Sequence, residues 1–143
     1  MPIGRAPNSE FGVEAQLLFH ARVKHFGLEP LFKSDDSLAW DCGVYNPLTN
    51  KFFRVQVKST SKKHSTNRYR IFTRRNQEMS YAKEDADIVA CYIGPENEFF
   101  LFPIDFVVAK KDILLPSKDG DPDAKLHTNR EFWEIFGPLD RGR

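Results

Sequence analysis

The chain has 143 residues, of which 41% are hydrophobic and 29% are charged, and its formal net charge is +1. This length fits a single domain with one buried core, and the composition excludes a disordered or fibrous protein. The N-terminus lacks the apolar stretch of a signal peptide, and the longest apolar run, at residues 88–93, is far shorter than the ~20 residues that span a bilayer. We therefore expect a soluble intracellular protein.

A helix is predicted near the N-terminus, over about residues 10–26. Its apolar residues follow the spacing of one helical face, Ser9 precedes them as a candidate N-cap, and Gly27 follows as a stop signal. Glu14 lies on or beside this apolar face. Because a carboxylate is almost never buried without a partner, we expect Glu14 to meet a cation, a metal or a hydrogen-bond donor.

A long β-hairpin is predicted next, with strands at residues 38–45 and 52–60 around the turn NPLTN. A third strand is predicted at residues 69–74, in YRIFTR. The polar, basic stretch SKKHSTNR separates the second strand from the third, and we expect it to be a mobile loop.

The rest of the chain returns to alternating helix and strand. We expect, in order, a short helix or turn, two strands, a short helix with an acidic loop, and a last helix; the corresponding segments include QEMSYAKE, DIVACYI, EFFLFPI and NREFWEIF. Cys42 and Cys91 lie in apolar, strand-like contexts without CxxC spacing, so we expect reduced core thiols. These elements predict one α/β domain.

The nearly even charge balance conceals one strongly basic segment. Residues 51–75 contain no Asp or Glu and nine cations: Lys51, Arg54, Lys58, Lys62, Lys63, Arg68, Arg70, Arg74 and Arg75. The rest of the chain then holds 12 cations (21 less these nine) against 20 acidic residues. This polarity favours a polyanionic partner on one face, and a solvated basic hairpin without a partner is the alternative.

Four polar side chains are predicted to converge on the hairpin. If its turn is centred between residues 48 and 49, Asp41 lies opposite Gln56, with their Cβ atoms ~5 Å apart. Lys58 lies two residues further along the same face of the strand. A helix laid over the sheet would bring Glu14 towards them.

This set of residues suits the hydrolysis of a phosphodiester. Mg²⁺ takes oxygen ligands, including one or two carboxylates, and supplies a positioned water and stabilisation of the leaving oxygen. We expect Asp41 as the central ligand, Glu14 as a second or water-mediated ligand, and the Gln56 side-chain oxygen and the Val57 carbonyl as neutral ligands. Lys58 is expected to orient or help deprotonate the attacking water, because a nearby metal favours the neutral amine.

The motif WD-x14-QVK, at residues 40–41 and 56–58, resembles that of the PD-(D/E)XK nuclease superfamily. Upstream, GVEAQLLFHARVKHFGL resembles the first helix of the family, with Glu14 at its acidic position. Downstream, Tyr81 and the segments DADIVACYI and EFFLFPI resemble the rest of the core. The pattern is most similar to that of the endonucleases associated with group I introns.

This resemblance implies a restriction-endonuclease-like fold, with a central mixed sheet flanked by helices in the order α-β-β-β-α-β. It implies one nuclease domain over residues 1–143, with a core at about 10–105 and a C-terminal extension at 106–143. The implied activity is a Mg²⁺-dependent endonuclease of the homing or restriction type, with Mn²⁺ as a substitute metal, that cuts double-stranded DNA as a homodimer. Without a signal peptide, such a protein is expected in the cytoplasm or associated with the nucleoid.

Two residues depart from the family motif. Trp40 replaces the proline, at a position that tolerates change because Asp41 does the ligating, and Gln56 replaces the acidic residue. The intron-associated endonucleases that the chain resembles also use Gln there. Because a neutral ligand weakens the hold on a second cation, we expect one well-occupied metal.

The basic segment straddles this site, as expected of a surface that binds phosphates. Most of its side chains are predicted to contact the DNA backbone. The candidates are Lys62, Lys63, His64, Arg68, Arg70, Arg74 and Arg75. Arginine also reads guanine in the major groove, so Arg70, Arg74 and Arg75 are candidates for base contacts.

Other interpretations stay open at this point. Glu14 and Lys58 can form a structural salt bridge, Asp41 can merely end a strand, and Asp85 and Asp87 are expected to shape the start of a strand rather than bind metal. Among nucleases, the alternative is a resolvase that cuts Holliday or other branched junctions. Outside that class, the alternative is a noncatalytic nucleic-acid-binding module.

Overall fold

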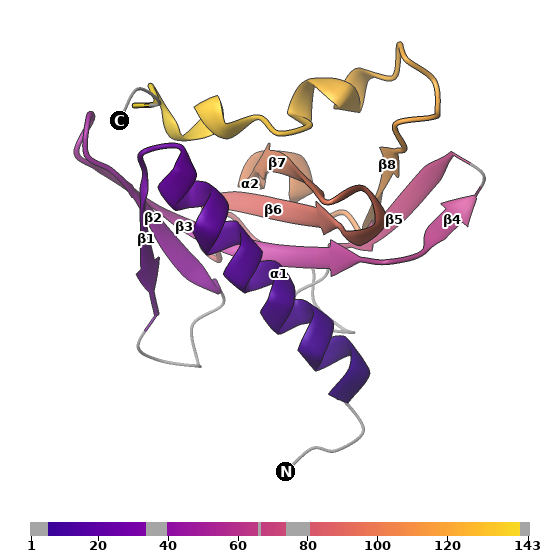
Figure 1. Ribbon diagram of the computed structural model, residues 1–143, viewed down its shortest axis with the longest axis horizontal. Coiled ribbons are helices and arrows are strands. Elements are labelled where there is room, and N and C mark those ends of the chain that lie inside the picture. The colour runs from indigo at the N-terminus through magenta and orange to yellow at the C-terminus, as the bar shows by residue number, and fades with distance from the viewer. Residues whose placement is uncertain (1–5, 34–39, 66, 74–80, 141–143) are drawn as a thin grey trace.

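The structure is a computed structural model that describes residues 6–33, 40–65, 67–73 and 81–140, with side chains from residue 12 onward. Helix α1 (Ala6–His25) lies across one face of the main sheet (Figure 1). Ala15, Phe19 and Val23 recur every four residues and are fully buried, so the predicted apolar face of the helix packs onto the sheet.

The two ends of α1 differ in how well the sequence predicts them. Gly27 follows the helix in the left-handed region, with φ 78°, which confirms the predicted stop signal. The helix begins at Ala6, before the predicted start near residue 10. The prediction of Ser9 as the N-cap is therefore wrong, because Ser9 lies inside the helix.

A five-stranded mixed sheet forms the centre of the fold (Figure 1). Its strands, in spatial order, are β1 (Glu29–Phe32), β2 (Cys42–Asn46), β3 (Lys51–Thr60), β6 (Ile88–Ile93) and β7 (Glu98–Pro103). β3 and β6 run parallel, and the other neighbouring pairs run antiparallel. The predicted α/β fold with a central mixed sheet is confirmed. β1 is not predicted from the sequence, because its four mostly exposed residues at the sheet edge lack an apolar alternation.

A second, three-stranded antiparallel sheet follows the end of β3. Its strands are β4 (Lys63–Ser65), β5 (Arg68–Phe72) and β8 (Asp112–Pro116). The prediction of a loop throughout residues 61–68 is wrong, since this stretch contains β4 and the start of β5. The third predicted strand is present as β5, but it pairs with β8 and lies outside the central sheet.

Two buried clusters hold the layers together. One lies between α1 and the central sheet and includes Val55 and Val57 of β3; the other lies between the opposite face of that sheet and the second sheet. Because side chains alternate along a strand, Gln56 and Lys58 lie on the face that looks away from α1. Both cysteines are buried and free, as predicted.

The C-terminal segment packs back over the α1 side of the molecule (Figure 1). η3 (Lys125–Asn129) and η4 (Trp133–Phe136) belong to this segment. Two further short helices precede it: η2 (Gly94–Glu96) between β6 and β7, and α2 (Ile104–Val107) after β7, whose Ile104 and Val107 join the cluster on the opposite face of the sheet. The Trp133 ring lies 5.6 Å from that of Phe19 and stacks on that of Phe26 at 5.1 Å. The predicted last helix is reduced to η4, because Glu131 and Gly137 adopt positive φ on either side of it. No helix in the described part of the chain is long and apolar enough to cross a membrane.

Candidate active site

Asp41 lies immediately before β2, where two hydrogen bonds fix it against β3. Its N–H donates to the carbonyl of Val55 at 2.8 Å, and its Oδ2 accepts the N–H of Val57 at 2.8 Å. These two bonds bracket Gln56 and place Asp41 alongside it. The hairpin pairs Cys42 with Val55, which agrees with the register predicted from the turn centre.

Gln56 is buried, and its Oε1 has no hydrogen-bond partner among the residues that the structure describes. An unpaired buried oxygen costs ~1–3 kcal/mol of folding free energy, so it points to a ligand that the folded chain does not itself supply. Such a ligand would meet both Gln56 and the neighbouring carboxylate of Asp41. One carboxylate and one amide oxygen suit a hard cation that keeps several of its own waters, such as Mg²⁺.

Lys58 is half-buried and lies two residues beyond Gln56 on the same face of β3. Burial lowers the pKa of Lys58, and the negative charge of Asp41 opposes this shift. Burial likewise raises the pKa of Asp41, against the hydrogen bond from Val57 and the charges of Lys33 and Lys58. Burial therefore favours the neutral forms of both Asp41 and Lys58, whereas the charge of each side chain favours the charged form of the other.

Three further residues surround this pair. The Nζ of Lys58 lies 5.1 Å from the centre of the Tyr81 ring, and Cys91 of β6 is its register partner. Burial raises the pKa of Cys91 to about 12, so it stays a thiol. The charge of Lys33 acts on Asp41 from the residue after β1. No sequence signal singles out Lys33, because the strand before it is itself not predicted.

Glu14 is exposed on α1, so burial does not require it to have a partner. Within the described residues, no ion pair or hydrogen bond joins Glu14 to Asp41, Gln56 or Lys58, and the alternative of a Glu14–Lys58 salt bridge is not present. The charge of Glu14 acts on Tyr92: burial raises the pKa of this phenol, Arg22 opposes it, and Glu14 adds to it.

Comparison with known proteins assigns the chain to a family. A family model described as "PD-(D/E)XK endonuclease" matches residues 14–134. The chain belongs to this family. Among solved structures, it is similar to a bacterial homing endonuclease, I-Ssp6803I, with a TM-score of 0.72 and 24% identity over 87% of this chain and 88% of the other. At this identity the likeness shows the fold. No curated protein matches the chain.

The donor set of this PD-(D/E)XK endonuclease contains few charged side chains. The described residues contain no group of three or more His, Cys, Asp and Glu side chains that could hold a metal. A metal at Asp41 would therefore depend on the amide oxygen of Gln56 and on backbone or water ligands. The neutral residue of the motif, Gln56, is thus the one whose side-chain oxygen has no hydrogen-bond partner within the described residues.

Two carboxylates near the site of the endonuclease hold the backbone in place, as predicted. Asp85 Oδ2 accepts the N–H of Ala82 at 2.8 Å. Asp87 binds Arg54 of β3, with 3.1 Å between Asp87 Oδ1 and the guanidinium Nη2. Both carboxylates therefore shape the start of β6 rather than offer themselves to a metal.

The predicted DNA-binding cations of the endonuclease fall into three groups. Exposed side chains on and beside the β4–β5 hairpin are Lys62, Lys63, His64 and Arg68. Arg70 instead forms an ion pair with Asp112 on β8, at 2.9 Å, and lies over the ring of Phe72. Arg74 and Arg75 lie outside the described residues. The hairpin therefore presents fewer unpaired cations than the sequence suggests.

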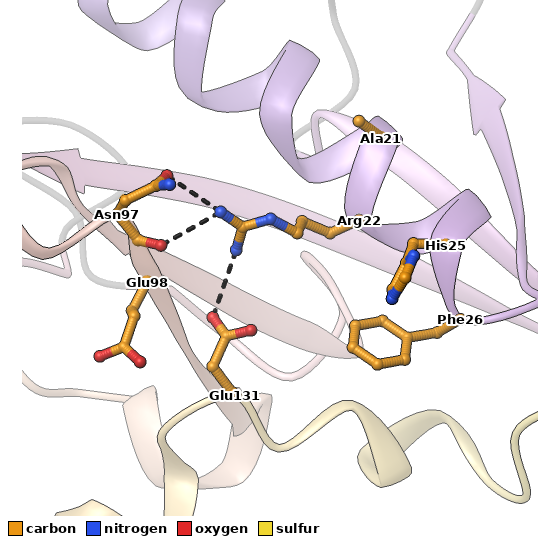
Figure 2. Close-up of a pocket in the computed structure, with 7 residues that line it drawn as sticks. All are labelled: Ala21, Arg22, His25, Phe26, Asn97, Glu98 and Glu131. Carbon is orange, nitrogen blue, oxygen red and sulfur yellow. Dashed lines mark hydrogen bonds and ion pairs between the residues drawn. The ribbon is translucent and has the colours of Figure 1, made fainter. Parts of the chain in front are cut away.

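The endonuclease also has an open pocket of about 540 Å³ on the α1 side of the sheet, lined by Ala21, Arg22, His25, Phe26, Asn97, Glu98 and Glu131. Figure 2 shows the Arg22 guanidinium crossing this pocket. It donates to Asn97 Oδ1 at 2.9 Å and pairs with Glu131 at 3.4 Å. The pocket is on the opposite face from Gln56 and Lys58, and its Arg22 binds both Asn97 and Glu131.

Proposed function

We propose that the chain is a metal-dependent endonuclease that hydrolyses phosphodiester bonds in duplex DNA, of the homing or restriction type. The observation that carries this proposal is the buried Gln56 Oε1, which lacks a partner within the described residues, on the residue that the two hydrogen bonds of Asp41 to Val55 and Val57 bracket. Membership of the PD-(D/E)XK endonuclease family supports the reaction. The fold likeness to a bacterial homing endonuclease supports DNA as the substrate.

Asp41 and Gln56 fit a hard divalent cation. Asp41 would supply the charged ligand and Gln56 Oε1 a neutral one, with the Val57 carbonyl and water completing the set. Glu14, which the sequence suggested as a further ligand, is exposed on α1 and has no place in this set. Mg²⁺ suits these oxygen donors, and Mn²⁺ takes the same ligands. When bound, such a cation supplies an activated water and stabilises the charge on the leaving oxygen.

The chain's own residues then position the reactants. The Val57 N–H holds Oδ2 of Asp41, which fixes the direction of the carboxylate. Lys58 would direct Nζ towards the attacking water. Burial lowers the pKa of Lys58, which is the direction that a proton acceptor requires. In its charged form the same Nζ balances the negative charge that develops on the phosphate.

The β4–β5 hairpin would bind the DNA next to this site. Lys62, Lys63, His64 and Arg68 are exposed there and would contact phosphates. Arg70, Arg74 and Arg75 are the candidates for contacts with bases. We also propose that two copies act together on the duplex as a homodimer, which sedimentation of the protein with and without DNA would test.

The test is cleavage of supercoiled plasmid in Mg²⁺ and in EDTA, by the wild type, Lys58→Ala and the control Lys24→Ala. Lys24 is an exposed lysine of α1 that pairs with Glu29, so its loss should leave cleavage unchanged. We expect nicked or linear DNA that requires the metal and disappears only in Lys58→Ala. Cleavage that persists in EDTA, or in Lys58→Ala, would contradict the proposed site. Faster cleavage of a four-way junction than of linear duplex would instead favour the resolvase.

A further inference from the structure

The side chain of Lys58 has an aromatic neighbour that the proposed chemistry does not use. Its Nζ lies 5.1 Å from the centroid of the Tyr81 ring, within the range of a cation–π interaction. Tyr81 is only 3% exposed and belongs to the buried cluster between the two sheets. The ring is therefore fixed by packing.

A lysine that acts on a substrate needs this kind of support. Its ammonium is a point charge on a stem of four methylene groups, which has many rotamers. Lys58 leaves β3 on the same face as Asp41 and Gln56, where a phosphate would lie. A fixed ring beneath Nζ removes many of these rotamers and replaces part of the hydration that the half-buried ammonium loses.

We propose that Tyr81 is a positioning residue for the proposed nuclease reaction, whose ring holds the Nζ of Lys58 towards Asp41 and the scissile phosphate. The proposal rests on the function proposed above. Tyr81 touches neither the metal nor the phosphate in this proposal, and it acts through Lys58 alone. Its hydroxyl is not required, because the interaction uses the face of the ring.

A Tyr81 ring that only fills space in the core would respond differently to substitution. If Tyr81 only fills space, any apolar residue of similar volume should preserve the direction of Lys58. If it positions Lys58, Tyr81→Phe should preserve the behaviour of the lysine and Tyr81→Leu should not. Phe106 provides a matched control, because it packs against the same cluster and its ring lies 4.4 Å from the Nζ of another lysine, Lys110.

The first experiment uses protein without metal or DNA. The side-chain protons of Lys58, assigned by comparison with Lys58→Ala, are observed by NMR in ¹³C-lysine-labelled protein. Ring currents should shift them upfield in the wild type, in Tyr81→Phe and in Phe106→Leu. In Tyr81→Leu they should return to the position of an ordinary lysine. An unchanged shift in Tyr81→Leu would overturn the contact.

The second experiment measures single-turnover plasmid cleavage at saturating protein, so that binding and chemistry separate. Tyr81→Phe should keep the wild-type rate within about twofold and Tyr81→Leu should lose about tenfold, with an unchanged dissociation constant for DNA. Tyr81→Leu that cuts at the wild-type rate would refute the positioning role while leaving the nuclease intact. A wild type that never cuts would refute the proposed function and the role of Tyr81 with it.

Discussion

Arg54 and Asp87 bind each other through side chain and backbone at once. The guanidinium Nη2 lies 3.1 Å from Asp87 Oδ1, the N–H of Arg54 donates to Asp87 Oδ2 at 2.8 Å, and the N–H of Asp87 donates to the Arg54 carbonyl at 2.8 Å. These bonds fasten β3 to the start of β6, two residues before Gln56. The first cation on this face of β3 is therefore structural.

The Arg54–Asp87 pair predicts a pH-dependent contribution to stability. Burial pushes the pKa of Asp87 up, but the hydrogen bonds and charge of Arg54 outweigh it, so the folded pKa is lowered. A lowered folded pKa stabilises the protein above the unfolded value of about 4, and this contribution is lost as the pH falls through the folded value. Asp87→Asn should therefore be less stable than the wild type at pH 7, and the gap should close below pH ~4.

The size of this effect should be modest. Both side chains are more than a quarter exposed, at 33% and 39%, so solvent screening limits the loss to on the order of 1 kcal/mol. Urea unfolding at several pH values measures it. The control is Asp105→Asn, which removes an ion pair of far more exposed groups, Lys83 and Asp105, and should change little. A gap that widens towards acid pH would contradict the assigned direction.

The relative positions of Asp41, Gln56 and Lys58 were predictable from the sequence, because these residues belong to one hairpin. The turn residues set the register of the hairpin, so Asp41, Gln56 and Lys58 could be placed together by counting from residues 48 and 49. Tyr81 and Lys33 could not be placed, because they reach the site from a turn before β6 and from an unpredicted edge strand. Their proximity depends on tertiary packing, which no spacing along the chain records.

Gln56 leads to the second prediction, which concerns the metal. Gln56→Leu removes the unpaired buried oxygen, so it should stabilise the metal-free protein by ~1 kcal/mol and abolish specific binding of Mg²⁺. Gln56→Glu places a second carboxylate beside Asp41. It should destabilise the protein in EDTA through like-charge repulsion and bind Mg²⁺ about tenfold more tightly than the wild type.

Thermal unfolding in EDTA and calorimetric titration with Mg²⁺ check both variants. Stability in EDTA and affinity for Mg²⁺ should change in opposite directions. Gln56→Leu should be more stable in EDTA and lose Mg²⁺ binding, whereas Gln56→Glu should be less stable in EDTA and bind Mg²⁺ more tightly. If Gln56→Leu bound Mg²⁺ like the wild type, Gln56 would not be a ligand. If Gln56→Leu, like Gln56→Glu, were less stable than the wild type in EDTA, Gln56 Oε1 would have a partner within the folded protein.

The third prediction concerns the exposed cations of the β4–β5 hairpin. If about six cations neutralise phosphates, the slope of log K against log salt should be roughly −5 for the wild type. Replacing Lys62, Lys63 and Arg68 together by Gln should reduce this slope by about 3, because each phosphate contact contributes roughly 0.9. Fluorescence anisotropy with a duplex between low and physiological salt measures the change, with Lys24→Gln as the control. Affinity that is indifferent to salt would contradict binding through this surface.

The second sheet explains why the sequence overstates the basic surface. Composition shows a segment without acidic residues, but the partner strand of β5 comes from residues 112–116 and brings Asp112 next to Arg70. Arg54 likewise pairs with Asp87, immediately before β6. Charge patterns along the chain identify the basic segment, but they do not reveal which cations are neutralised by distant strands.

The last prediction concerns the C-terminal extension, to which the sequence assigns no role. Asn46, at the end of β2, is 1% exposed, and its Nδ2 donates to the carbonyls of Phe136 at 2.8 Å and Pro138 at 3.0 Å. Its Oδ1 also accepts the N–H of Leu48 at 2.9 Å. One buried amide thus joins the β2–β3 hairpin to the C-terminal segment.

Asn46→Ala should cost ~2–3 kcal/mol of unfolding free energy, because it leaves carbonyls without donors near the buried core. Leu48→Ala, in the same turn, is the control: the Leu48 side chain is 54% exposed and only its backbone N–H binds Asn46, so little change is expected. Limited proteolysis distinguishes the local effect from the global one. Cleavage of Asn46→Ala should begin in the C-terminal segment, before the rest of the chain is attacked. Equal protection of that segment in Asn46→Ala and the wild type would mean that the aromatic packing of Trp133 and Phe136 suffices to hold it.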